Sequence, residues 1–172
     1  MLSSCQVSNF DSLGSWSTYH NQRYNFKFPY PSNWVSVPMP DNGDGRAFRD
    51  PQNPTTEIRG WAANQLPESV APRSSKGLYE GRHGLKNKPS SLNGKAEYLP
   101  NFQQPNFTTE QGLKGNLEVE VGSDISVMRL TLSQGKVQYN WQGQCDNKKF
   151  ASYYRFFYYV ASQYRISPPQ QP

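Results

Sequence analysis

Cysteine and histidine are the residue types in this chain that would supply nucleophilic or metal chemistry. There are two of each: Cys5, Cys145, His20 and His83. A nucleophilic cysteine needs a base within hydrogen-bond reach, and a structural zinc site needs four converging ligands. Cys145 ends a predicted strand, and both histidines lie in polar segments where a turn or an exposed position is the simpler interpretation. No G-x-S-x-G, P-loop, H-E-x-x-H or dinucleotide-binding fingerprint is present. We therefore expect no enzyme activity, no metal site and no cofactor; a buried carboxylate pair for acid–base work stays open.

Cys5 follows Leu2, Ser3 and Ser4, and this spacing is similar to the lipobox of a bacterial lipoprotein. In that motif an aliphatic residue and two small residues precede the cysteine whose thiol receives the lipid. The sequence therefore predicts Cys5 as a lipid-attachment site, and the membrane as a partner through this N-terminal lipid. Two alternatives stay open. Cys5 is a small buried residue, or it forms a disulfide with Cys145, which lipidation would exclude.

The sequence around this motif sets the expected domain organisation. The apolar region that precedes a lipobox in a precursor is missing before Leu2, so we expect Met1 to have been placed on a trimmed chain. The alternative is a native Met1 and an accidental motif. No stretch approaches the roughly 18 apolar residues of a membrane span. We predict a tether over residues 1–17, a single domain over 18–167 and a tail over 168–172.

A basic segment lies between residues 73 and 95. Six basic residues stand there against one acidic residue, Glu80, so this segment accounts for the formal net charge of +5 over 172 residues. A solvated loop is the plain interpretation. The functional prediction is a contact surface for anionic lipid or an acidic partner, made by Arg73, Lys76, Arg82, Lys86 and Lys88. Nucleic acid is not expected, because stacking aromatic residues do not alternate with the basic ones and no recognition motif is present.

Alternating apolar residues predict an antiparallel sheet. Strands are expected over 24–30, 34–37, 55–63, 116–122, 124–134 and 136–145, with hairpin turns in 38–54. Thr56, Ile58, Gly60 and Ala62 share one face of the strand over 55–63. The last three strands form a meander, in which a break in phase near Met128 is left open. The connection over 65–106 is rich in Pro, Ser, Gly and Lys, and a short helix is expected within 75–86.

A helix is predicted over residues 149–165. Phe150, Tyr153, Tyr154, Phe157, Val160, Ala161 and Tyr164 follow the spacing of one helix face. Asp146 or Asn147 can cap its start, and Pro168 prevents its continuation. We expect this aromatic face to pack on the sheet.

Four stretches resemble PsbP-like proteins: "YHNQRYNFKFPYPSNW" (19–34), "DNGDGRAFRDP" (41–51), "GKVQYNWQGQC" (135–145) and "VASQYRI" (160–166). The resemblance covers mainly 19–63 and 116–167, and it departs from the family at Gln163 and Tyr164. It implies an α+β fold, the PsbP-like α/β/α sandwich with a central antiparallel sheet and a C-terminal helix packed on it. The family includes extrinsic subunits of photosystem II, cyanobacterial lipoproteins of the thylakoid lumen and other bacterial lipoproteins. No family metal site or photosystem contact maps onto this chain.

These observations predict a non-catalytic, lipid-anchored binding or assembly module. We expect a monomer outside the cytoplasm, in the periplasm or the thylakoid lumen of a bacterium. The resemblance adds two hypotheses: a cyanobacterial source, and a photosynthetic membrane complex as the partner. The alternative function is a small-ligand carrier or enzyme that uses an aromatic pocket between the C-terminal helix and the sheet.

Overall fold

The C-terminal half of the chain forms the predicted antiparallel meander. The computed structural model describes residues 14–38, 42–65 and 104–168, and in it three long strands pair in sequence order: β7 (Lys114–Val121), β8 (Ile125–Gln134) and β9 (Val137–Asp146). In the turn between β8 and β9, Gly135 has a φ of 61°, in the left-handed region that glycine enters without steric cost. The prediction of a meander is confirmed.

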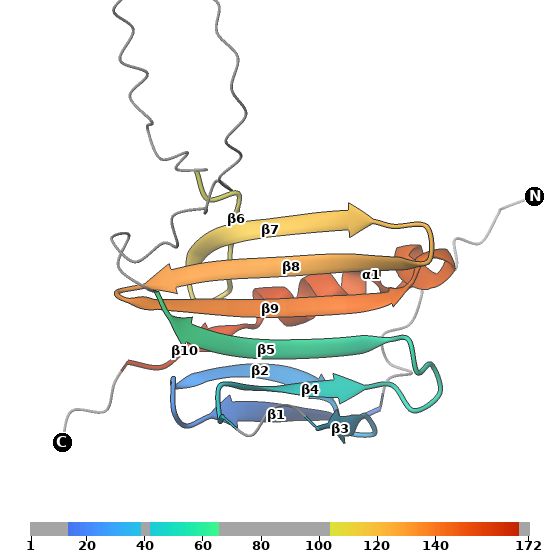
Figure 1. The fold of residues 1–172 in the computed structure, drawn as a ribbon, viewed down its shortest axis with the longest axis horizontal. Coiled ribbons are helices and arrows are strands. Elements are labelled where there is room, and N and C mark those ends of the chain that lie inside the picture. Colours follow the sequence, from blue (N-terminus) through green and yellow to red (C-terminus); the bar gives the residue numbers. More distant parts are fainter. Residues whose placement is uncertain (1–13, 39–41, 66–103, 169–172) are drawn as a thin grey trace, which may run out of the picture. The chain divides into compact units, whose positions relative to one another are not determined.

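Four further strands extend the meander into a seven-stranded sheet. They are β3 (Val35–Val37), β4 (Gly45–Arg49), β5 (Glu57–Asn64) and β6 (Phe107–Thr108). The strand order is β3-β4-β5-β9-β8-β7-β6, and each neighbouring pair is antiparallel (Figure 1). The sequence indicates turns over 38–54, and β4 lies between them as an additional strand.

A second sheet has three strands. β2 (Phe26–Pro31) is its centre, between β1 (Trp16–Asn21) and β10 (Arg165–Ile166), and both pairings are antiparallel. The sequence predicts β2 but neither neighbour. β1 begins at Trp16, within the predicted tether, and the indole ring of Trp16 packs edge-on against Tyr159 at 5.2 Å between ring centroids.

The helix α1 (Asn147–Ser162) begins two residues before the predicted range, directly after Asp146, one of the two predicted capping residues. The carboxylate of Asp146 accepts a hydrogen bond from the backbone N–H of Lys148 at 2.8 Å, which satisfies one of the free donors of the first turn. The predicted end at residue 165 is wrong. The ring of Tyr164 stacks on Phe26 at 5.5 Å, and residues 165–166 pair with β2, so the chain leaves the helix after Ser162.

The alternation of β8 is unbroken. Ten consecutive pairs with β9 keep one register, which leaves no break in phase near Met128. Met128 and Leu130 therefore face α1, and Val127 faces the other side of the sheet. Ser126 also faces inward, because its hydroxyl donates a hydrogen bond to the side-chain oxygen of Asn147 at 2.9 Å. A buried hydroxyl is tolerated where such a partner is present.

The core lies on one face of the seven-stranded sheet. α1 covers β8 and β9 there (Figure 1), and β2 covers β5 through the ring of Phe28. Close approach depends on glycine at two positions: the ring of Phe157 lies on Gly143, and the ring of Phe28 lies on Gly60. Val119 and Val121 of β7 lie opposite the inward-facing Met128 and Ser126, but their side chains are 42% and 68% exposed.

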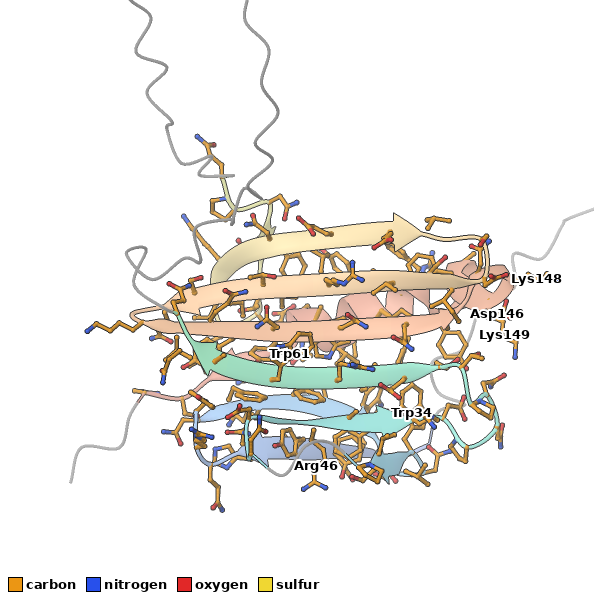
Figure 2. All side chains as sticks on the ribbon, viewed as in Figure 1. Trp34, Arg46, Trp61, Asp146, Lys148 and Lys149 are labelled. Carbon is orange, nitrogen blue, oxygen red and sulfur yellow. The ribbon has the colours of Figure 1, made fainter. Side chains whose placement is uncertain are left out.

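The opposite face of the sheet carries polar side chains and Trp61 (Figure 2). Glu57 accepts hydrogen bonds from Arg49 at 2.9 Å and from Arg59 at 2.6 Å. Along β9 the side-chain amides form hydrogen bonds with one another: Gln138 donates to Asn140 at 3.0 Å, and Gln142 donates to Gln144 at 3.0 Å. Among the described elements, α1 forms the single helical layer. No described helix has the length and hydropathy to cross a membrane.

Candidate binding site

The residues predicted to contact partners lie outside the described residues. They are Cys5, the lipid-attachment position, and the basic residues Arg73, Lys76, Arg82, Lys86 and Lys88. The short helix expected within 75–86 lies outside them as well. These predictions stay predictions, and the site described below is built from other side chains.

Cys145 is a free thiol at the inner face of β9 and is fully buried. Burial raises the pKa of this thiol to about 11; the neighbouring Asp146 adds to the rise and Lys149 partly offsets it. A thiol with such a pKa is protonated at neutral pH, and it is the thiolate that acts as a nucleophile. Cys145 is therefore a packing residue.

The interface between α1 and the sheet is filled with side chains. Phe157, Val160 and Trp141 are each at most 1% exposed, and a Cβ placed on Gly143 would lie 2.5 Å from the ring of Phe157. An interface packed this closely leaves no room for a ligand. Where α1 covers β8 and β9, the packed rings therefore leave no room for the aromatic ligand pocket of the alternative hypothesis.

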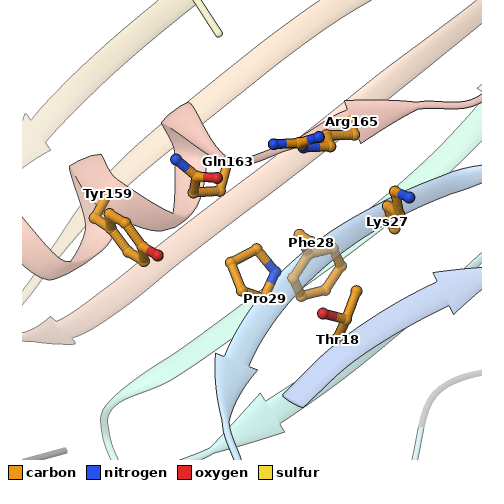
Figure 3. Close-up of a pocket in the computed structure, with 7 residues that line it drawn as sticks. All are labelled: Thr18, Lys27, Phe28, Pro29, Tyr159, Gln163 and Arg165. Atoms are coloured by element: carbon orange, nitrogen blue, oxygen red, sulfur yellow. The ribbon is translucent and has the colours of Figure 1, made fainter. Parts of the chain in front are cut away.

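A cleft opens between the end of α1 and the small sheet (Figure 3). It has a volume of about 280 Å³, and β2 contributes Phe28, whose ring is buried on the other face of the strand, and Pro29 to its lining. Five polar side chains from four places in the chain line its rim: Thr18, Lys27, Tyr159, Gln163 and Arg165. Thr18 comes from β1, Lys27 from β2, Arg165 from β10, and the other two from the last turn and cap of α1.

Two cations lie at directly opposed positions in this cleft. Arg165 of β10 faces Lys27 of β2, and on the other side Lys27 faces His20 of β1. Since opposed residues of neighbouring strands point to the same face of a sheet, the three side chains form one row across the small sheet. Phe26 and Phe28 flank Lys27 on β2 and are buried on the opposite face. We call His20, Lys27 and Arg165 the basic row.

The basic row differs from the charged clusters of the described chain that contain a carboxylate. Arg23 pairs with Asp44, Arg49 and Arg59 with Glu57, and Arg129 with Glu120. Neither Lys27 nor Arg165 forms an ion pair with any carboxylate of residues 14–38, 42–65 and 104–168. The cleft can therefore supply several hydrogen-bond donors and net positive charge to a ligand.

The sequence alone does not identify this cleft. Period-2 alternation places Lys27 on the polar face of its strand, but the neighbours of β2 were not predicted. Arg165 was assigned to the helix, where it would lie far from Lys27. The strand pairing of residues 165–166 brings the two cations together, and that pairing depends on contacts distant in sequence. No group of three His, Cys, Asp or Glu side chains suited to a metal occurs in the described part of the chain.

The architecture is that of an α+β protein with an antiparallel sheet covered by a C-terminal helix, so the predicted fold class is confirmed. No family model matches the chain, and no curated protein matches its sequence. A crystal structure from Bacteroides thetaiotaomicron is similar with a TM-score of 0.51 and 11% identity, over 90% of this chain and 49% of that one.

Two further solved structures are similar with lower scores. Cyanobacterial PsbP (CyanoP) from Synechocystis sp. PCC 6803 has a TM-score of 0.47 and 12% identity, over 96% of this chain and 99% of that one. LpqN, involved in cell envelope biogenesis of Mycobacterium tuberculosis, has a TM-score of 0.40 and 15% identity, over 90% and 91% of the two chains. At these identities the likeness concerns the fold alone.

Proposed function

We propose that this protein is a non-catalytic binding module, held at the extracytoplasmic surface of a bacterial membrane by a lipid on Cys5. The sequence Leu2-Ser3-Ser4-Cys5 supports the anchor. The position of the polar groups supports the binding role. Among the described residues, the core is packed with rings and the one thiol is buried, whereas an unpaired basic row lies at the surface. This last observation carries the proposal.

The anchor and the domain would act together. A single acyl chain gives only reversible binding, so a stable anchor needs two or more chains, or one chain and a basic surface. The basic segment with Lys86 and Lys88 would supply such a surface, or a contact with an acidic partner. We propose that the protein acts as an assembly or binding factor of a membrane complex, in the periplasm or in a thylakoid lumen. The module would act as a monomer.

Mass spectrometry tests the anchor directly. The chain, fused behind a lipoprotein signal peptide in a host that processes lipoproteins, is expected to gain two or three acyl chains on Cys5 and to lose all residues before it. The variant Cys5→Ala is the matched control and should stay unprocessed. An unmodified Cys5 in a host that lipidates a reference lipoprotein would refute the anchor.

The binding role needs a separate measurement. Membranes of the native host, or their solubilised complexes, are incubated with the tagged protein and the retained partners are compared with those of the Lys27→Gln and Arg165→Gln variants. Specific retention that the variants lose supports a binding module. Turnover of any substrate by the purified chain, lost in the same variants, would overturn the non-catalytic role.

A further inference from the structure

We propose that the cleft between α1 and the small sheet binds a phosphate group. The proposal goes beyond the lipid anchor and does not depend on it, since the cleft is built from residues 18–165 alone. It begins with the basic row. Lys27 and Arg165 occupy directly opposed positions on neighbouring strands, where like charges are destabilising. An anion bound between them would convert this repulsion into attraction.

The negative end of the nearby helix α1 could account for the position of one of these two cations, but not of both. The carboxyl end of a helix carries partial negative charge, which favours a nearby cation. α1 has no basic residue in its last turn, so Arg165, three residues beyond Ser162, could serve this role. Lys27 lies on the far side of Arg165 from that helix end, across the β2–β10 pairing. The helix end therefore does not account for Lys27, whereas an anion bound between the two cations would stabilise both.

The donors around the cleft fit a tetrahedral anion. The Arg165 guanidinium can offer two parallel N–H groups, and the Lys27 ammonium is a mobile point charge. Tyr159 and Gln163 add a hydroxyl and an amide from the helix side, and Thr18 adds a hydroxyl from β1 (Figure 3). Phosphate oxygens point in four directions, whereas a carboxylate presents two oxygens in one plane. The donors that line the cleft come from four elements, β1, β2, β10 and α1, and this favours phosphate.

The size of the cleft limits what the phosphate can carry. A volume of about 280 Å³ lies just below the range of about 300–1,000 Å³ of small-molecule pockets. The ring of Pro29, on the same face of β2 as Lys27, can contact a short aliphatic group. A phosphate with a glycerol-sized substituent fits this description. That chemistry occurs in free phosphate monoesters and in the headgroup of an anionic phospholipid, and the experiment below separates the two sources.

Calorimetric titration of the full chain tests the site itself. The probes are inorganic phosphate and glycerol 3-phosphate at low ionic strength, with glycerol as the uncharged control. We expect one site, and a loss of affinity of about tenfold or more in each of Lys27→Gln and Arg165→Gln, since each removes a charged hydrogen bond. Lys148→Gln makes the same change of charge at the other end of α1, about 17 Å from Tyr159 along the helix, and should bind as the unchanged chain does (Figure 2).

Vesicles distinguish the two sources. The full chain is sedimented with vesicles of phosphatidylcholine alone, or with phosphatidylglycerol added, in the presence or absence of glycerol 3-phosphate. Binding to the anionic vesicles that is weakened by Lys27→Gln and displaced by glycerol 3-phosphate assigns the cleft to a headgroup. Binding of free glycerol 3-phosphate, with vesicle binding unchanged by Lys27→Gln, assigns it to a soluble monoester.

Thermal unfolding tests the repulsion between Lys27 and Arg165 in the absence of a ligand, which measurements of affinity do not. In phosphate-free buffer, Lys27→Gln is expected to raise the melting temperature, because it removes the repulsion with Arg165; Lys148→Gln should leave it unchanged. Phosphate should then raise the melting temperature of the unchanged chain more than that of Lys27→Gln. Failure of phosphate and glycerol 3-phosphate to bind at low ionic strength, or equal binding by both cleft variants with their fold intact by circular dichroism, overturns the proposal. Neither result bears on whether Cys5 is lipidated.

Discussion

The hydroxyl of Tyr153 on α1 donates a hydrogen bond to the carboxylate of Asp50 at 3.0 Å. Asp50 lies in the turn between β4 and β5, and it is held there by the side-chain amide of Asn53 at 2.9 Å and the backbone N–H of Gln52 at 2.8 Å. One buried carboxylate thus ties the helix to a turn 103 residues away in sequence. This contact fixes α1 to the β4–β5 turn six residues before Tyr159, the first residue of α1 that lines the cleft.

Removing the hydroxyl of Tyr153 should destabilise the fold. In Tyr153→Phe the carboxylate of Asp50 loses one of its donors while it stays buried, which costs about 1.5–3 kcal/mol for a hydrogen bond to a charged group. Urea unfolding followed by tyrosine and tryptophan fluorescence measures the loss. Tyr164→Phe is the matched control. The hydroxyl of Tyr164 is buried without a hydrogen-bond partner in the described residues, so its removal should cost nothing or stabilise the fold. Equal losses in the two variants would contradict the role of the Asp50 contact.

The same carboxylate makes part of the stability dependent on acid pH. Burial alone would raise the pKa of Asp50, but the hydrogen bonds from Asn53, Gln52 and Tyr153 outweigh it and hold the pKa below its usual value. The ionised group therefore stabilises the fold fully above the unfolded pKa of about 3.9, and this contribution is lost as the pH falls through the lower folded pKa. Unfolding free energies of the unchanged chain and of Asp50→Asn should differ at pH 7 and converge towards pH 3. A constant difference over that range would exclude the linkage.

Tyr153 gives the corresponding dependence at alkaline pH. Burial, and then the hydrogen bond to the negative Asp50, raise the pKa of Tyr153 to about 12. A raised folded pKa means that the contribution is present below the unfolded pKa of about 10 and is lost as the pH rises through the folded value. In Tyr153→Phe this alkaline loss between pH 10 and 12 should be smaller than in the unchanged chain.

A methyl group at Gly143 should strain the core. The Cβ of Gly143→Ala would lie 2.5 Å from Cδ1 of Phe157 and 2.8 Å from Trp141, and both rings are at most 1% exposed. Overpacking of this kind costs about 1–3 kcal/mol. The smaller side chain of Phe157→Leu should relieve it, so the double variant should be more stable than the sum of the two single losses predicts. Additive losses, measured by urea unfolding, would contradict direct contact as the cause.

The thiol of Cys145 should be inert in the folded protein. The thiol is fully buried, so a reagent in solution cannot reach it. Its pKa is raised to about 11, so at pH 8 very little of it is the reactive thiolate. In Cys5→Ser, Ellman's reagent is expected to detect no thiol in native buffer and one thiol in urea. Rapid reaction without urea would show that β9 opens locally or that α1 does not cover this position.

The sequence predicts those parts of the fold that short-range patterns determine. Alternation identifies β5, β7, β8 and β9, and Asp146 identifies the start of α1. The parts that it misses depend on distant partners. The sequence Trp16–Asn21 has no strong apolar alternation, and it becomes β1 because β2 offers it six paired positions. Residues 165–166 have helix-compatible spacing, but pairing with β2 takes precedence.

The candidate site was missed for the same reason. Lys27 and Arg165 are 138 residues apart in sequence, and each is an ordinary surface cation by its local pattern. They become a pair only through the β2–β10 register. The basic segment, in contrast, is visible as a local excess of charge, and its role stays a prediction because it lies outside the described residues.

Charge reversal in that basic segment should weaken attraction to anionic membranes. Each Lys near such a surface contributes about 1 kcal/mol, so Lys86→Glu with Lys88→Glu should lower binding to phosphatidylglycerol vesicles by about tenfold or more at low salt. The loss should shrink as salt is added, because exposed charges are screened. Lys148→Glu with Lys149→Glu is the matched control: it changes the net charge equally at the first turn of α1, where acidic residues are favourable. Equal weakening by the two pairs would mean that net charge, and not the segment, governs the attraction. Unchanged binding at low salt would remove the segment from the contact surface.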